Sequence, residues 1–262
     1  MKEEIKIFFT ALMFYTRIPC PKNIDHSPDY INKATRYFPL IGWVVGTLSF
    51  AVFGLSSLLF DINISVLFSL IAGVLVTGAF HEDGLADVFD GFGGGWTKAK
   101  ILEIMKDSRV GAYGVIALIF LFALKYLSLN NLFAKIAIKD YLLIASIFIS
   151  YHSLSRLTAI NIVFTSQYSR EDESSKAKPI AKAHSPREII GAYFFGLLPL
   201  FVLCFFHWQF VLVVLPLFLL YFYSRRYFNK WIDGYTGDCL GAVEQMAECV
   251  CLLTFSALWK FM

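Results

Sequence analysis

Four carboxylates and a run of glycines lie within fifteen residues of this chain, directly after a long apolar stretch. The segment His81–Gly95 holds Glu82, Asp83, Asp87 and Asp90. If the segment is helical, the three aspartates fall at positions i, i+4 and i+7 and share one face. Like charges so placed repel one another unless a cation lies among them, and hard carboxylate oxygens suit Mg²⁺. We therefore predict a magnesium site here, in preference to a solvated helix end with incidental acids.

Groups that could bind an anion follow the acidic segment. Gly93 and Gly94 belong to a glycine run whose backbone N–H groups can approach a ligand closely, although such a run is more often a hinge. Lys106 and Arg109 precede an expected helix, where they could hold phosphate oxygens; the alternative is ordinary anchoring of a membrane helix. We predict that His81 and these four residues bind substrate.

A third set of polar groups lies inside an apolar stretch. His152, Ser155 and Arg156 fall about two helical turns from one end of an expected span at 140–164. An arginine at that depth costs a few kcal/mol if it faces lipid. Arg156 should therefore face the interior of the bundle, and we predict that it binds a substrate anion there; the alternative is a snorkelling, structural role.

A second acidic cluster begins the last apolar segment. Asp238 is followed by Glu244 and Glu248, and too few residues remain after Glu248 for a helix to cross about 30 Å of hydrocarbon. Both glutamates then lie within the last span. Inserting each one near the membrane centre costs roughly 2.5–3.5 kcal/mol, unless a hydrated, metal-bearing or cationic cavity holds it. We predict Asp238 and Glu244 as metal ligands and Thr236 as a substrate-binding residue. The alternative for Asp238 is a helix N-cap.

The elements that position these residues are too apolar for a soluble domain. Hydrophobic residues make up 57% of the chain and aromatic residues 17%. Lysine and arginine are not clustered on one element, which argues against nucleic-acid binding. The five cysteines have no zinc-like spacing, so we expect free thiols. The short apolar run at 5–13 predicts an interfacial or re-entrant helix rather than a signal peptide.

Runs of about 20 apolar residues predict the membrane topology. Candidate spans lie at 38–60, 62–80, 111–129, 140–164, 188–206, 208–224 and 239–262. The long connecting segments then fall on one side of the membrane, at 1–37, 81–110, 165–187 and 225–238. That side also holds most of the lysines and arginines, so it should be cytoplasmic. We predict an all-α, polytopic integral membrane protein with about six to seven transmembrane helices. It forms one domain over 1–262, with a cytoplasmic active face.

Three motifs in this order resemble those of the cobalamin synthase family, the adenosylcobinamide-GDP ribazoletransferases of bacterial and archaeal vitamin B12 assembly. They are His81–Asp87 with Asp90 and Gly91, then Met105–Arg109 with Gly111 and Gly114, and finally Thr236–Ala242 with Glu244. Softer matches are Phe14–Pro19 and Phe38–Gly42, and the resemblance runs from about residue 8 to the end. Glu82 stands where the family often has an apolar residue.

The resemblance implies a Mg²⁺-dependent transferase of the cell (inner) membrane that joins adenosylcobinamide-GDP to α-ribazole or its 5′-phosphate and releases GMP. Its partners would be these substrates and the lipid bilayer. The resemblance is also compatible with a homo-oligomer or with a complex with other cobalamin-assembly enzymes. Asp83 and Asp87, with Asp90 or Asp238, would hold the metal. Lys106, Arg109 and Arg156 would balance charge on the phosphoryl oxygens. Asp90 and Asp238 are the leading candidates for the base.

A single pyrophosphate site would need both acidic clusters. We therefore expect the N-terminal end of the last helix to pack beside the cytoplasmic end of the second span, which would bring Asp238 close to Asp83 and Asp87. Two other functions compete. A CDP-alcohol phosphotransferase would need an arginine directly after the alanine of the Asp83–Gly84 motif, where this chain has Asp87. A secondary transporter would hold its acids at the membrane midplane rather than at one face.

Overall fold

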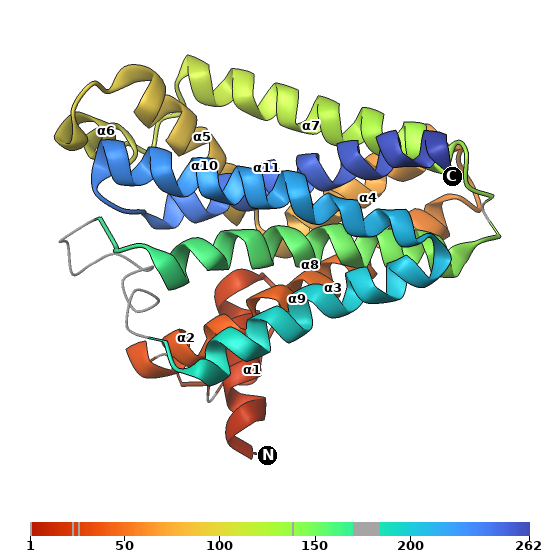
Figure 1. Ribbon diagram of the computed structural model, residues 1–262, viewed down its shortest axis with the longest axis horizontal. Coiled ribbons are helices and arrows are strands. Elements are labelled where there is room, and N and C mark those ends of the chain that lie inside the picture. The colour runs from red at the N-terminus through yellow and green to blue at the C-terminus, as the bar shows by residue number, and fades with distance from the viewer. Residues whose placement is uncertain (1, 23, 26, 138, 170–183) are drawn as a thin grey trace.

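The computed structural model describes residues 2–22, 24–25, 27–137, 139–169 and 184–262 of the chain (Figure 1). Over these ranges the elements are α-helices with a few 3₁₀ segments such as Trp208–Val213, and residues 170–183 of the predicted segment 165–187 lie outside them. The helices are α1 (Lys2–Tyr15), α2 (Pro28–Ala34), α3 (Phe38–Ser56), α4 (Ile62–Thr77), α5 (Phe80–Gly94), α6 (Lys98–Ile104), α7 (Ala112–Phe133), α8 (Tyr141–Thr165), α9 (Pro186–Phe206), α10 (Val214–Ile232) and α11 (Gly237–Leu258).

Six helical stretches of the described chain are long and apolar enough to cross a membrane, and a bent pair of helices can supply a seventh. They are built on α3, α7, α8, α9, α10 and α11, and the bent pair is α4 with α5. This confirms the prediction of an all-helical membrane protein with six to seven spans. All five cysteines are free, as their spacing indicated.

The acidic segment forms a helix of its own because two residues between α4 and α5 adopt left-handed backbone conformations. Gly78 (φ 68°) closes α4, and Ala79 (φ 57°) turns the chain directly into α5. The two helices consequently meet at 88°. The apolar run predicted to span 62–80 therefore ends at Thr77, and the acids that follow lie on a separate, sharply turned element.

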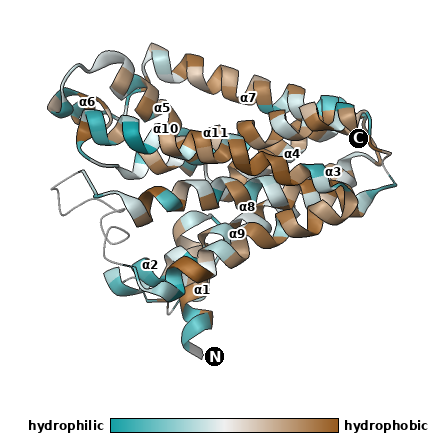
Figure 2. Cartoon of the chain, viewed as in Figure 1, coloured by the Kyte–Doolittle hydropathy of each residue, from teal (hydrophilic) through white to brown (hydrophobic). Residues whose placement is uncertain are grey.

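Two helices lie in the middle of the bundle, and the others place apolar side chains on its outside. Most residues of α8 and α11 are buried, whereas Phe120 of α7, Phe205 of α9 and Leu215 of α10 are among many large apolar side chains that are exposed. Such an apolar surface would be unstable in water but suits lipid. Figure 2 shows the hydrophobic residues along the length of the long helices, with hydrophilic residues at the end that carries α6 and on α2 and the start of α1.

The polar end brings together segments that are far apart in the chain. Figure 1 places α5, α6, the start of α7, the end of α10 and the start of α11 at this end, while the turns after α3, α7 and α9 lie at the other. The sequence predicted this grouping from the alternation of long and short connections. Helix α1, predicted to be interfacial or re-entrant, crosses the direction of the long helices and packs against α2 and α3.

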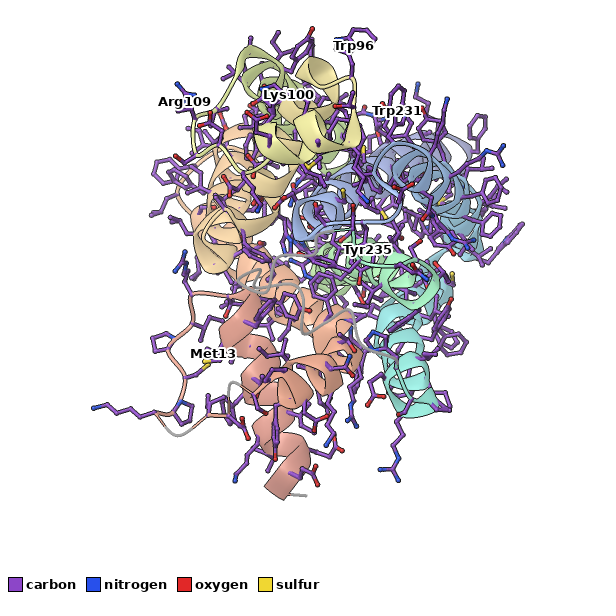
Figure 3. All side chains as sticks on the ribbon, turned by 90° about the vertical axis from the view of Figure 1, so that its left-hand side faces the viewer. Met13, Trp96, Lys100, Arg109, Trp231 and Tyr235 are labelled. Carbon is purple, nitrogen blue, oxygen red and sulfur yellow. The ribbon has the colours of Figure 1, made fainter. Side chains whose placement is uncertain are left out.

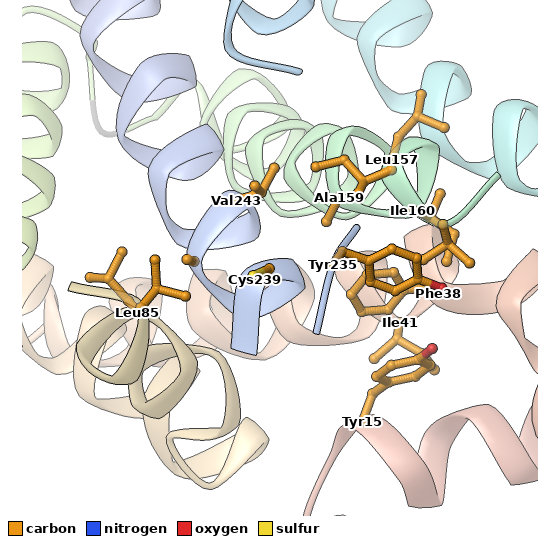
Figure 4. Close-up of a cluster of buried hydrophobic side chains, with 14 of the residues drawn as sticks. Tyr15, Phe38, Ile41, Leu85, Leu157, Ala159, Ile160, Tyr235, Cys239 and Val243 are labelled. Carbon is orange, nitrogen blue, oxygen red and sulfur yellow. The ribbon is translucent and has the colours of Figure 1, made fainter. Parts of the chain in front are cut away.

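A buried apolar cluster fixes α1, α3, α5 and α11 to one another beside the polar end (Figure 4). The ring of Tyr15 stacks on that of Phe38 with centroids 4.2 Å apart. Leu85, Tyr235 and Val243 complete the contact from α5, from the turn before α11, and from α11 itself. Close packing of these side chains holds the four helices together. The acidic helix α5 is thus held by packing as well as by its polar groups.

Candidate active site

The two acidic clusters meet where α5 crosses α11 at the polar end. Neither Gly84 nor Gly241 has a side chain to keep the two backbones apart. A Cβ on Gly84 would lie 2.9 Å from the carbonyl oxygen of Asp238, and one on Gly241 would lie 3.0 Å from that of His81. Glycine is needed at both positions because the helices touch backbone to backbone. The start of the last helix therefore packs against the acidic segment, as we expected from the sequence.

Three of the predicted acids lie around this crossing. Asp83 is exposed, whereas Asp87 and Asp238 are half-buried. Asp238 is not the N-cap of α11. The cap is Thr236, whose Oγ1 accepts a hydrogen bond from the backbone N–H of Cys239 (3.3 Å) and donates to Asp238 Oδ2 (3.3 Å). Asp238 lies in the first turn of α11, where the partial positive charge of the helix N-terminus favours a carboxylate.

Asp90 caps the third span. Its Oδ2 accepts a hydrogen bond from the N–H of Gly111 (2.6 Å), and its Oδ1 accepts one from the N–H of Gly114 (2.9 Å). A Cβ on either glycine would collide with this carboxylate, which explains why the chain has glycine at both positions. Both oxygens of Asp90 are thus engaged by backbone N–H groups at the start of α7.

Replacing Asp90 by alanine should destabilise the fold by about 1–3 kcal/mol, because two N–H groups at the start of α7 lose their acceptor. Asp90→Asn, which keeps one side-chain oxygen, should lose less. Thermal unfolding of the purified protein in detergent measures both effects. An unchanged melting temperature in Asp90→Ala would show that the cap contributes nothing.

The glycine run at the end of α5 is explained by close packing. The ring of Tyr113 would meet a Cβ on Gly93 at 2.6 Å, and Ile101 would meet one on Gly95 at 2.7 Å. Gly94 is exposed and has more room, since only Ile104 Cδ1 lies near it, at 3.2 Å. The run therefore lets α6 and the start of α7 approach α5.

The predicted phosphate-binding residues Lys106 and Arg109 follow α6 at the polar end. Arg109 is exposed and projects outward in Figure 3, where Lys100 and Trp96 also reach outward and Tyr235 lies deeper. Arg109 forms an ion pair with Asp107 (2.6 Å), and the hydrogen bonds of this pair lower the pKa of Asp107 to about 2. Both groups are therefore ionised at neutral pH.

Arg156 and the two glutamates of the last span belong to one buried network between α7, α8 and α11. Arg156 Nη1 lies 2.8 Å from Glu244 Oε1, and Lys125 Nζ lies 2.5 Å from Glu248 Oε2. His152 Nδ1 is 2.6 Å from Glu248 Oε1, and Lys125 also donates to Gln245 Oε1. Each glutamate thus has a cationic side chain beside it, which offsets the cost of burying its charge.

Within the described residues, one group has the spacing of a metal site: ligand atoms of His152, Glu244 and Glu248 all lie within 4.8 Å of one another. An arginine nitrogen lies among the same atoms. Arg156 Nη1 is 2.8 Å from Glu244 Oε1, 3.5 Å from His152 Nδ1 and 3.6 Å from Glu248 Oε1. The guanidinium therefore supplies the cation that the sequence required for Glu244, and Arg156 faces a carboxylate of its own chain.

His81, predicted to bind substrate, is buried at the start of α5. Its ring packs against those of Phe38 and Phe80, with centroids 5.7 and 5.2 Å away. It lies on the side of α5 that faces the bundle, whereas Asp83 is exposed.

A family model described as cobalamin-5-phosphate synthase matches residues 7–256. The chain belongs to that family. Proteins named adenosylcobinamide-GDP ribazoletransferase are similar over nearly their whole length. That of Shewanella oneidensis is 44% identical over 253 residues, covering 95% of this chain and 93% of the relative. That of Leptospira interrogans is 44% identical over 265 residues, covering 99% and 98%. No solved structure matches significantly.

Membership of the cobalamin-5-phosphate synthase family confirms the resemblance carried by the three motifs. It also decides against the CDP-alcohol phosphotransferase and transporter alternatives. Two polar residues of the buried network, Lys125 and Gln245, were not predicted. A lysine inside the apolar stretch 111–129 was the available signal, since an ionisable residue in a span usually has a partner there. Its partner could not be identified before α7 and α11 were seen to pack together.

Proposed function

We propose that this chain is an adenosylcobinamide-GDP ribazoletransferase whose active site lies at the crossing of α5 and α11. The main support is this crossing, because it brings the helices that carry Asp83, Asp87 and Asp238 together at the polar end. The chain also belongs to the cobalamin-5-phosphate synthase family. The products would be adenosylcobalamin, or its 5′-phosphate, and GMP.

The proposed reaction is a displacement at phosphorus. A hydroxyl oxygen of α-ribazole, or of its 5′-phosphate, forms a bond to the phosphorus that carries the cobinamide. The bond from that phosphorus to the bridging oxygen of the pyrophosphate breaks, and GMP leaves with the bridging oxygen. The hydroxyl proton passes to a base on the protein. Such a reaction needs aligned reactants and neutralisation of charge on the phosphoryl oxygens.

Asp83, Asp87 and Asp238 fit a Mg²⁺ ion by their chemistry and exposure. They offer hard carboxylate oxygens, and none of the three is fully buried, so substrate phosphates and water can supply the other ligands. When bound, Mg²⁺ would neutralise charge on the pyrophosphate and orient it. We leave Asp90 and Glu244 out of this set, because Asp90 caps α7 and Glu244 is paired with Arg156.

The remaining roles follow from the same placement. Because both oxygens of Asp90 accept backbone hydrogen bonds, we propose Asp238 as the base for the ribazole hydroxyl. Lys106 and Arg109, in the segment between α6 and α7, would contact phosphoryl oxygens. Arg156, paired with Glu244, would hold α8 against α11 rather than bind substrate.

The direct test is an assay with the purified protein in detergent. Adenosylcobinamide-GDP, α-ribazole and Mg²⁺ should give GMP and adenosylcobalamin in equal amounts. CDP-diacylglycerol with inositol is the matched control, and no CMP is expected from it. Release of CMP without release of GMP would contradict the proposal.

We further propose that the polar end faces the cytoplasm, since in the described part of the chain lysines and arginines gather there, between α5 and α7 and at the end of α10. Reporters fused at Gly95 and Asp233 should then be cytoplasmic, and a reporter at Ala134, in the turn after α7, should lie outside. Alkaline phosphatase and green fluorescent protein fusions at each site measure this. An external reporter at Gly95 or Asp233 would refute the cytoplasmic site.

A further inference from the structure

A small, partly open cavity lies between α4 and the buried ionic network. Its volume is about 20 Å³, which is room for about one water molecule. Its walls come from α3, α4, α5, α7, α8 and α11, so it lies where most of the spans meet. The charged side chains of that network are already paired with one another, but several other polar groups that line the cavity have no partner among the described residues.

Three buried polar atoms on these walls have no hydrogen-bond partner in the described protein: Ser49 Oγ, Glu82 Oε2 and His152 Nε2. Their residues are 0%, 7% and 5% exposed. Lys125 also lines the cavity, and its ammonium has three N–H groups, of which two are used by Gln245 and Glu248. The cavity thus offers both donors and acceptors from four different helices.

The charges around the cavity decide what it can hold. A cation would lie beside the ammonium of Lys125 and the guanidinium of Arg156, and an anion would lie beside Glu82 and Glu248. A neutral molecule that both donates and accepts meets no such repulsion. It can accept from Lys125 and donate to Glu82, and it satisfies His152 Nε2 whichever ring nitrogen carries the proton.

We propose that one water molecule is bound in this cavity and joins Ser49 of α3, Glu82 of α5, Lys125 of α7 and His152 of α8. A buried water with two to four polar partners is a stable part of a protein, and this cavity has the size and the partners for one.

The water would hold the acidic helix at its first turn. No side chain caps the start of α5, because the residue before it is Ala79. Glu82 lies in that first turn, directly before Asp83, and the water links it to α3, α7 and α8. The water would in this way help to position Asp83. That role in catalysis rests on the proposed function, whereas the water site itself does not.

The test compares two glycine-to-alanine variants by thermal unfolding in detergent. A Cβ on Gly73 would enter the cavity at ordinary contact distances, 3.4 Å from Ser49 Oγ and 3.9 Å from His152 Cε1, and would displace the water. A Cβ on Gly54, in α3, would meet nothing within 4 Å. Both variants gain the helix propensity of alanine, so Gly54→Ala is the matched control.

Gly73→Ala should melt about 2–8 °C below Gly54→Ala, because displacing the water leaves the polar atoms without partners. A melting temperature equal to or above that of the control would show a dry cavity and overturn the proposal. A cation in the cavity would also overturn the proposal. It would be revealed if the melting temperature of the wild type rises when Na⁺ or K⁺ replaces choline, while that of Ser49→Ala does not.

The Ser49→Ala variant is a second test of the bound water, and it does not depend on filling the cavity. With a bound water, the variant loses a hydrogen bond and should melt below the wild type. In a dry cavity, the variant only removes an unpartnered hydroxyl, so its melting temperature should be unchanged or higher, and the proposal would fail.

Discussion

Replacing Asp83 or Asp87 by asparagine should lower kcat/KM for GMP release by about 10²–10³-fold or more, because each variant removes a carboxylate proposed to hold the metal on the pyrophosphate. Asp83 is exposed and Asp87 half-buried, so both proteins should still insert, purify and melt near the wild-type temperature. Raised Mg²⁺ should partly restore activity, since losing one of several carboxylates weakens a site without removing it.

A suitable control is Glu103→Gln. Glu103 is also an exposed acid at the polar end, but its ion pair is with Lys100 of the same short helix (3.0 Å). The activity of the Glu103→Gln variant should match that of the wild type. Full activity in either aspartate variant would show that this acidic face is merely solvated, and the magnesium site would have to be sought elsewhere.

Replacing Arg156 by methionine should destabilise the protein by about 3–5 kcal/mol, because it leaves the carboxylate of Glu244 buried without its cation. Combining it with Glu244→Gln should recover part of the loss, since the buried charge is then gone as well. The measurement is thermal unfolding of the two single variants and the double variant. Arg109→Met, which changes an exposed arginine, should alter stability by no more than about 0.5 kcal/mol.

The same experiment separates the two interpretations of Arg156. If Arg156→Met melts like the wild type but raises KM for adenosylcobinamide-GDP, the arginine binds substrate, as the sequence led us to predict. A lower melting temperature with partial recovery in the double variant is the signature of the ion pair that the structure contains.

The membrane topology could be predicted from the sequence because it depends on local properties. The length of each apolar run sets where a span begins and ends, and the alternation of long and short connections sets which segments share an end. The need of one pyrophosphate site for both acidic clusters also predicted that the last helix packs against the acidic segment, a contact that Gly84 and Gly241 allow. The boundary at Thr77 differed because Gly78 and Ala79 adopt left-handed conformations that apolar runs do not reveal.

The roles of individual charged residues depended on tertiary contacts. Asp90 shares a helical spacing with Asp83 and Asp87, yet its partners are Gly111 and Gly114, more than twenty residues away. Spacing along one helix identifies which residues share a face and says nothing of what packs against that face.

The residue types and their place in an apolar stretch require that Glu244, Glu248 and Arg156 have partners inside the bundle, because a buried charge is too costly to leave alone. The identity of each partner depends on how the helices pack. The packing of α7 and α8 against α11 placed Lys125 beside Glu248, and Arg156 beside Glu244. Desolvation acts on each residue separately and can be anticipated from its type, whereas a pairing depends on which helices become neighbours.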